Sequence, residues 1–197
     1  FVKQPAGFKS GPIPGCGIYE TTNYVLLIAN SGSYCTDQQE FPHGKLGNEQ
    51  LSWLSNAIQA HPPDGKWRIL MVHHHPFNYP YPTANKDISC IEEGPELVEL
   101  VAQHEIDLIC HGHRHHPKLF TQLQSGWKRP ATFFCAGSLA VNETERNYGQ
   151  IPNLFHIISL EQRLSNRAAF GYVLSYEYTI SDGWHPVRFS KETPLDP

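Results

Sequence analysis

Short apolar runs alternate with segments of helical periodicity in the first half of the chain. The runs YVLLIA (residues 24–29), ILMV (69–72) and IDLIC (106–110) predict strands, and the continuous run 69–72 is typical of a strand buried on both faces. Residues 48–61 and 94–105 lie between these runs and place apolar side chains on one side of a helix. The pattern therefore predicts the order strand, helix, strand, helix, strand.

Both predicted helices carry end signals. In the first, Leu54 and Ile58 recur at helical spacing, Asn48 is the expected N-cap, and Pro62 ends the helix; the second has Pro95 in its first turn. A strand–helix–strand unit aligns its strands in parallel, so the runs 69–72 and 106–110 should be neighbours with their carboxyl ends at one sheet edge. Open α/β sheets bind their ligands at that edge.

The C-terminal part contains three further runs that predict strands. They are ATFFCAGSL (131–139), NLFHIISL (153–160) and YVLSYEYTI (172–180), and since no strong helical period joins them, we expect an antiparallel sheet. With 197 residues, 40% of them hydrophobic, the chain has the size of a single α/β domain spanning residues 1–197.

Composition excludes several classes of partner. The net charge is −4 and no Lys/Arg block is present, so the chain has no footprint for nucleic acid or for an anionic membrane. No apolar run approaches the roughly 20 residues that cross a bilayer. Five scattered cysteines without a CxxC spacing favour a reducing compartment over a disulfide framework, and we expect a cytoplasmic protein.

Seven of the twelve histidines follow the two strands expected to be parallel neighbours. They form two clusters: His73, His74 and His75, then His111, His113, His115 and His116. Because neutral imidazole is the commonest protein ligand of transition metals, this convergence predicts a metal site rather than ordinary surface histidines. His113 and His115 share a side if the chain stays extended, and Gly112 allows a tight turn beside them.

The sequence ILMVHHHP, followed one helix later by DLICHGHRH, resembles the last two metal-binding motifs of the calcineurin-like metallophosphoesterases. The flanking stretches GKLGNEQLSWLSNAI, FFCAGSL and PNLFHIISL are similar to that family too, so the resemblance covers about residues 20–160 and leaves 161–197 as C-terminal strands. It implies a mixed β-sheet sandwich flanked by helices. It also implies two divalent metal ions, such as Mn, Fe or Zn, and hydrolysis of a phosphate-ester substrate by a metal-bridged hydroxide.

The resemblance assigns roles to individual histidines. His74 matches the penultimate ligand, His113 would bind the same ion, and His115 would bind the second ion. His73 and His75 are possible ligands because a run of three histidines leaves the register open by one, although His73 should point away from His74 in a regular strand.

The neighbours of these residues have less direct roles. His111 is a possible further ligand or supports the ligands, and His116 is expected to support the ligands or the fold. Arg114 is a candidate for binding the anionic substrate, with an exposed, solvated Arg as the alternative.

The family's three earlier motifs, which supply a bridging aspartate and further ligands, are absent from this chain. Three neutral imidazoles cannot offset the repulsion between two divalent ions, and Asp107 lies at the wrong end of its strand. We therefore expect the C-terminal part of a metallophosphoesterase domain, inactive alone and without an assignable catalytic residue. The N-terminal half would come from the same or another chain.

Two alternatives to an incomplete phosphoesterase remain at this point. A phosphoesterase-like module could bind a partner without catalysis. A hydrolase with one zinc ion held by three histidines is the other.

Overall fold

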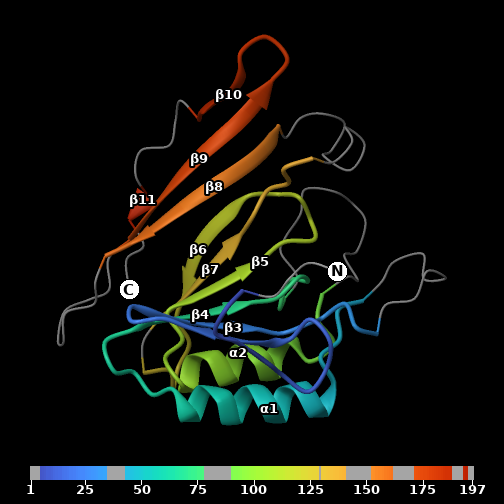
Figure 1. The fold of residues 1–197 in the computed structure, drawn as a ribbon, viewed down its shortest axis with the longest axis vertical. Coiled ribbons are helices and arrows are strands. Elements are labelled where there is room, and N and C mark those ends of the chain that lie inside the picture. Colours follow the sequence, from blue (N-terminus) through green and yellow to red (C-terminus); the bar gives the residue numbers. More distant parts are fainter. Residues whose placement is uncertain are drawn as a thin grey trace.

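The described part of the chain forms two β-sheets and two helices (Figure 1). The computed structural model describes residues 5–34, 43–77, 90–128, 130–140, 152–161, 171–187 and 193–194. The larger sheet has the order β1-β2-β3-β4-β5-β7-β6, and the smaller has β9 paired with β8, β10 and β11. Their bounds are β1 Phe8–Ser10, β2 Gly17–Glu20, β3 Tyr24–Ile28, β4 Trp67–Met71, β5 Leu108–His111, β6 Lys118–Gln122, β7 Ala131–Cys135, β8 Asn153–Leu160, β9 Gly171–Thr179, β10 Gly183–Pro186 and β11 Thr193–Pro194.

The parallel centre of the large sheet follows the predicted strand–helix–strand order. Helix α1 (Gly47–Ala60) connects β3 to β4, helix α2 (Gly94–Gln103) connects β4 to β5, and both strand pairs are parallel. Both helices lie against the same face of the sheet (Figure 1). The carboxyl ends of β4 and β5 therefore meet at one edge, as the sequence predicts.

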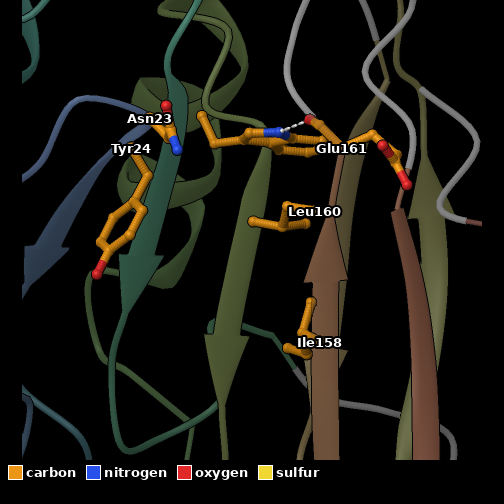
Figure 2. A pocket seen from close by; sticks show the side chains of 6 residues that line it. Asn23, Tyr24, Ile158, Leu160 and Glu161 are labelled. Carbon is orange, nitrogen blue, oxygen red and sulfur yellow. Dashed lines mark hydrogen bonds between the residues drawn. The ribbon is translucent and has the colours of Figure 1, made fainter.

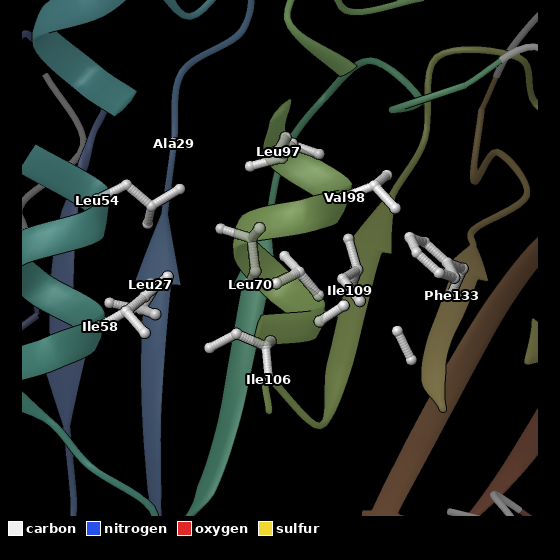
Figure 3. Packing of buried hydrophobic residues seen from close by; sticks show 14 of the residues in the cluster. Leu27, Ala29, Leu54, Ile58, Leu70, Leu97, Val98, Ile106, Ile109 and Phe133 are labelled. Atoms are coloured by element: carbon white, nitrogen blue, oxygen red, sulfur yellow. The ribbon is translucent and has the colours of Figure 1, made fainter. Parts of the chain in front are cut away.

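A row of apolar residues in register forms the core beneath the helices. Leu27, Leu70, Ile109 and Phe133 are paired across β3, β4, β5 and β7, and each is almost completely buried. Figure 3 shows this row facing apolar side chains of both helices, including Leu54 of α1. Each such burial contributes about 1.5–3 kcal/mol, which fixes the strands that carry the histidines.

The second sheet covers only part of the opposite face. Leu108 of β5 and Phe134 of β7 form a cluster with Val173 of β9, so these two central strands are buried on both sides. Met71, at the end of β4, is 42% exposed. The expectation that the run 69–72 is buried on both faces is therefore wrong at Met71.

The C-terminal strands divide between the two sheets. The strands β8 and β9 pair antiparallel, as predicted, and β10 and β11 join them. In contrast, β7 belongs to the large sheet and pairs in parallel with β5. All five residues of β7 are buried, which is the pattern of a central parallel strand. The α/β class and the mixed-sheet sandwich are thus confirmed, and the placement of residues 131–135 in the antiparallel sheet is wrong.

The start of α1 differs from its prediction. Asn48 is exposed and makes no capping hydrogen bond. The backbone N–H groups of Leu46 and Gly47 instead donate to the Glu93 carboxylate, at 3.0 and 2.9 Å. A carboxylate from the start of α2 therefore neutralises the positive end of α1.

The carboxyl ends of both helices share one buried cation. The guanidinium of Arg68, which is 2% exposed, donates to the carbonyls of His61, His104 and Glu105, the residues that follow α1 and α2. This arrangement satisfies helix-end carbonyls and places a positive charge at the negative ends of two helix dipoles. Within the described residues, neither helix is long and apolar enough to span a membrane.

Candidate metal centre

Three imidazoles converge where β4 and β5 end. His73 and His74 follow β4, His113 follows β5, and potential ligand atoms of all three lie within 4.8 Å of one another. His74 is buried, His113 is half-buried and His73 is exposed, so the group opens from the interior to the surface. Among the described residues, no other group of histidine, cysteine or acidic side chains converges in this way.

The spacing within this group suits ligation of one ion. His113 Nδ1 lies 3.2 Å from His73 Nε2, and the ring centroids of His74 and His113 are 4.3 Å apart. Two nitrogens bound to a tetrahedral zinc ion at about 2.0–2.1 Å are roughly 3.3 Å apart. The His73–His113 pair therefore has the separation of two ligands of the same ion.

Backbone hydrogen bonds hold the two histidine loops together. Val72 N–H donates to Cys110 O at 3.0 Å, and Gly112 N–H donates to His73 O at 3.0 Å, which extends the contact between β4 and β5 beyond the strands. The chain then turns sharply, because Arg114 N–H donates to Gly112 O at 2.9 Å across His113, whose φ is +71°. Such γ-turns are rare and strained, and strain of this kind concentrates at functional sites.

This turn alters the expected geometry of two histidines. The extended conformation does not persist past β5, since His113 and His115 both have positive φ, so their two-residue spacing does not fix a shared side. His73 likewise fails to point away from His74, because the regular strand ends at Met71. His115 is outside the converging group.

The buried side of His74 is tightly defined. Ser31 Oγ lies 2.9 Å from His74 Nδ1 and accepts a hydrogen bond from His74 N–H at 3.0 Å. A Cβ atom at Gly44 would lie 2.5 Å from His74 Cβ, so only glycine fits beside this histidine. His74 is therefore held by contacts on two sides.

The remaining residues of the clusters surround this group. His75 and His111 are buried, with ring centroids 6.4 Å apart, and the His75 ring is 6.3 Å from that of His113. Arg114 and His116 are partly exposed, and the charge of Arg114 contributes to lowering the pKa of His75 and His116. Arg114 thus lies beside the histidines, where an anion could reach it.

Burial keeps the imidazoles in the neutral form that binds metals. Desolvation is the main cause in each case: it lowers the pKa of His74 to about 3, and those of His75, His111 and His113 to about 4. Neighbouring histidines add to the effect for His74 and His113. The pKa of His73 is lowered by desolvation and then by the nearby His115.

No carboxylate of the described residues joins the three imidazoles. Asp107 lies at the amino end of β5, where its Oδ2 accepts a hydrogen bond from Arg68 N–H at 2.7 Å. This position agrees with the prediction that Asp107 is at the wrong edge. The aromatic and Pro-rich residues 77–81 after β4 are predicted to form a substrate-side loop, because loops at this sheet edge often contact ligands. Residues 78–81 lie outside the described residues, and Phe77 packs on Phe133 in the core.

A pocket of about 290 Å³ lies elsewhere, between the two sheets. Figure 2 shows Tyr24, Leu160 and Glu161 in its wall, together with the hydrogen bond from Trp67 Nε1 to Glu161 O. It lies at the amino ends of β3 and β4, so it is separate from the histidine edge.

Sequence reasoning missed the residues that surround His74. Ser31 looks like part of a strand-ending Asn-Ser-Gly turn, and Gly44 carries no sequence signal. Gln50 could have been noticed, because it is a polar residue on the helix side that also carries Leu54 and Ile58, and it is fully buried.

The sequence matches one known protein family. A model of the calcineurin-like phosphoesterase family matches residues 8–117, more than half of the chain and all of both histidine clusters. The chain therefore belongs to the calcineurin-like phosphoesterase family. No curated protein matches its sequence.

Proposed function

We propose that this chain carries the histidine side of the metal centre of a metal-dependent phosphoesterase. The observation that supports it is the convergence of His73, His74 and His113 at the carboxyl ends of two parallel strands, in a member of this family. The buried, neutral imidazoles are suited to divalent transition metals, and the 3.2 Å spacing of the His73–His113 nitrogens fits one such ion.

Each histidine of the centre would have its own role. His74 and His113 hold one ion, with His73 as the third nitrogen, and His115 supplies a ligand of a second ion. Arg114 binds the anionic phosphate ester. A divalent ion held there supplies Lewis-acid polarisation of a phosphoryl oxygen and lowers the pKa of a water.

A centre with two ions needs anionic ligands in addition to these histidines. Two divalent cations a few ångströms apart repel strongly unless a carboxylate offsets their charge. We infer that such carboxylates come from outside the described residues, either from further residues of the same polypeptide or from another chain.

A single zinc ion is the second candidate. Three imidazoles without a carboxylate match a His₃ site whose fourth position is open to water, and the described residues contain such a set. The number of ions per chain separates the two proposals.

The first test compares metal content and hydrolysis in the wild type and single variants. We expect His113→Ala to lose bound zinc or manganese and to lose hydrolysis of a chromogenic phosphodiester in the complete enzyme. His115→Ala should lower the metal content from two ions to one if the centre is dinuclear. Emission spectroscopy measures the metal, and absorbance follows the released phenol.

His185→Ala is the matched control, because His185 lies on β10 of the second sheet. It should keep both metal and activity. Normal metal content in His113→Ala would contradict the proposed centre, and one ion per wild-type chain would favour the mononuclear site.

We also infer a cytoplasmic location. The described cysteines, Cys16, Cys90, Cys110 and Cys135, are free thiols, which supports a reducing compartment.

A further inference from the structure

Ser31 contacts His74 through two different atoms. It is fully buried in the loop after β3, and its Oγ lies 3.0 Å from His74 N and 2.9 Å from His74 Nδ1. The backbone N–H can only donate, so Ser31 Oγ accepts that hydrogen bond. In the hydrogen bond between Ser31 Oγ and His74 Nδ1, either atom can be the donor. The direction of this bond decides which ring nitrogen of His74 can bind a metal.

A neutral imidazole carries one proton and binds metal through the other nitrogen. If Nδ1–H donates to Ser31 Oγ, the lone pair of Nε2 is available to an ion. If Ser31 donates instead, Nε2 carries the proton and cannot be a ligand. Ligation through Nε2 therefore requires Ser31 to accept from both the backbone and the ring of His74.

The position of Ser31 is fixed by the buried Gln50 of α1. Gln50 Oε1 accepts from Asn30 N–H at 2.9 Å, and its Nε2 donates to Asn30 O at 3.0 Å and to Leu46 O at 2.9 Å. Lys45 N–H donates to Ser31 O at 2.8 Å. The residue before Ser31 is thus held by a two-point amide contact, and Ser31 itself by a third bond.

We propose that Gln50 and Ser31 are positioning residues of the metal centre: Gln50 fixes the loop at Asn30, and Ser31 holds His74 in the tautomer that offers Nε2 to the ion. Neither residue is proposed as a metal ligand. The inference rests on the proposed function, because it assumes that His74 is a ligand.

A second serine–histidine pair in the molecule provides the control. His156 Nδ1 lies 2.9 Å from Ser175 Oγ, the same distance as in the His74 pair, but His156 Nε2 also accepts from Gly137 N–H at 3.3 Å. Both ring nitrogens of His156 are therefore occupied within the protein. Removing Ser175 tests the loss of a partly buried serine–histidine bond away from the centre.

The experiment titrates the 197-residue chain with Zn²⁺ and with Co²⁺. We expect Ser31→Ala to weaken binding roughly 10- to 100-fold and to change the Co²⁺ absorption bands, whereas Ser175→Ala should bind as the wild type does. Gln50→Met should weaken binding in the same direction. The double variant Ser31→Ala/Gln50→Met should bind the ion only slightly more weakly than the single variant with the lower affinity. The two effects should not add, because both residues act through His74.

A second measurement needs no metal and does not require the variants to be as stable as the wild type. Long-range ¹H–¹⁵N spectra of the metal-free chain should show His74 protonated at Nδ1 in the wild type. In Ser31→Ala we expect the Nε2–H tautomer, which free histidine favours, to gain population. Unchanged His74 signals in that variant would overturn the tautomer assignment.

Failure of this inference differs from failure of the metal centre. If Ser31→Ala and Gln50→Met bind Zn²⁺ as the wild type does while His74→Ala does not, the positioning role is wrong and the centre stands. If His74→Ala and His113→Ala also bind normally, the proposed centre itself is wrong.

Discussion

At the scale of single residues, burial rather than charge pairing determines the chemistry of the histidines. Desolvation is the leading cause of every lowered histidine pKa in the two clusters, and His75 and His111 are as buried as the apolar core. Burying these imidazoles therefore keeps them neutral at the sheet edge where we propose the metal centre, and it lowers the stability of the folded state at low pH. The free energy of unfolding should therefore decrease as the pH falls.

The first prediction concerns the pH dependence of folding. The pKa of fully buried His75 falls from 6.5 to about 4, so the unfolded chain binds its proton first as the pH drops. Stability from His75 is constant above about pH 6.5 and is lost between pH 6.5 and pH 4, reaching a loss of about 2 kcal/mol at pH 5.

Urea unfolding in EDTA at pH 7 and pH 5 measures this loss. His75→Asn cannot titrate in this range, so its free energy of unfolding should fall by about 2 kcal/mol less than that of the wild type between the two pH values. Equal losses in both proteins would show that His75 is accessible to protons in the folded state. Comparing differences removes the direct effect of the substitution.

Residue-scale prediction from sequence found the histidines but not their geometry. The two clusters and the shared edge follow from the apolar runs, whereas the meeting of His73 with His74 depends on where β4 ends. Ser31 contacts His74 43 residues further along the chain, and Gln50 contacts Asn30 20 residues earlier. Only the folded chain creates such contacts, so the sequence does not reveal them.

At the scale of elements, local periodicity predicted the strands and helices with strong patterns. The parallel pairing of β4 with β5 followed from the intervening helix. The strands β1, β2, β6 and β10 were missed because they are short and mostly half-exposed, so they lack a continuous apolar run. The start of α1 could not be predicted from Asn48, since its capping group, Glu93, comes from another helix.

The second prediction tests the shared cation at the helix ends. Arg68→Met leaves the carbonyls of His61, His104 and Glu105 without this donor, and we expect the free energy of unfolding to fall by about 3 kcal/mol. Urea titration at pH 7 measures the change. Because Arg68 lies at the amino end of β4, metal binding by the folded variant should be preserved.

Lys66→Met is the matched control for Arg68→Met. It removes a neighbouring cation that pairs with Glu20 at the surface, where solvent weakens the interaction, and it should change stability much less. If both variants lose similar stability, the helix-end role of Arg68 is not supported.

At the scale of the whole molecule, the layered fold builds the centre from separate segments. The proposed ligands His74 and His113 follow different strands, and Ser31 follows a third, so these side chains come together only when β3, β4 and β5 are assembled under α1 and α2. The proposed centre would therefore link metal binding to folding, because an ion that binds only the native chain stabilises it by mass action.

The last prediction follows from this linkage. Zn²⁺ at about 100 times its dissociation constant should stabilise the native chain by about 2.7 kcal/mol, which raises the Tm by roughly 5–10 °C for a domain of this size. Calorimetry with Zn²⁺ and after EDTA measures the shift. His113→Ala should lose it, whereas His185→Ala, altered in the second sheet, should keep it. A Zn²⁺ shift of equal size in His113→Ala would place the stabilising ion elsewhere on the molecule, because only the native group at the ends of β4 and β5 requires that imidazole.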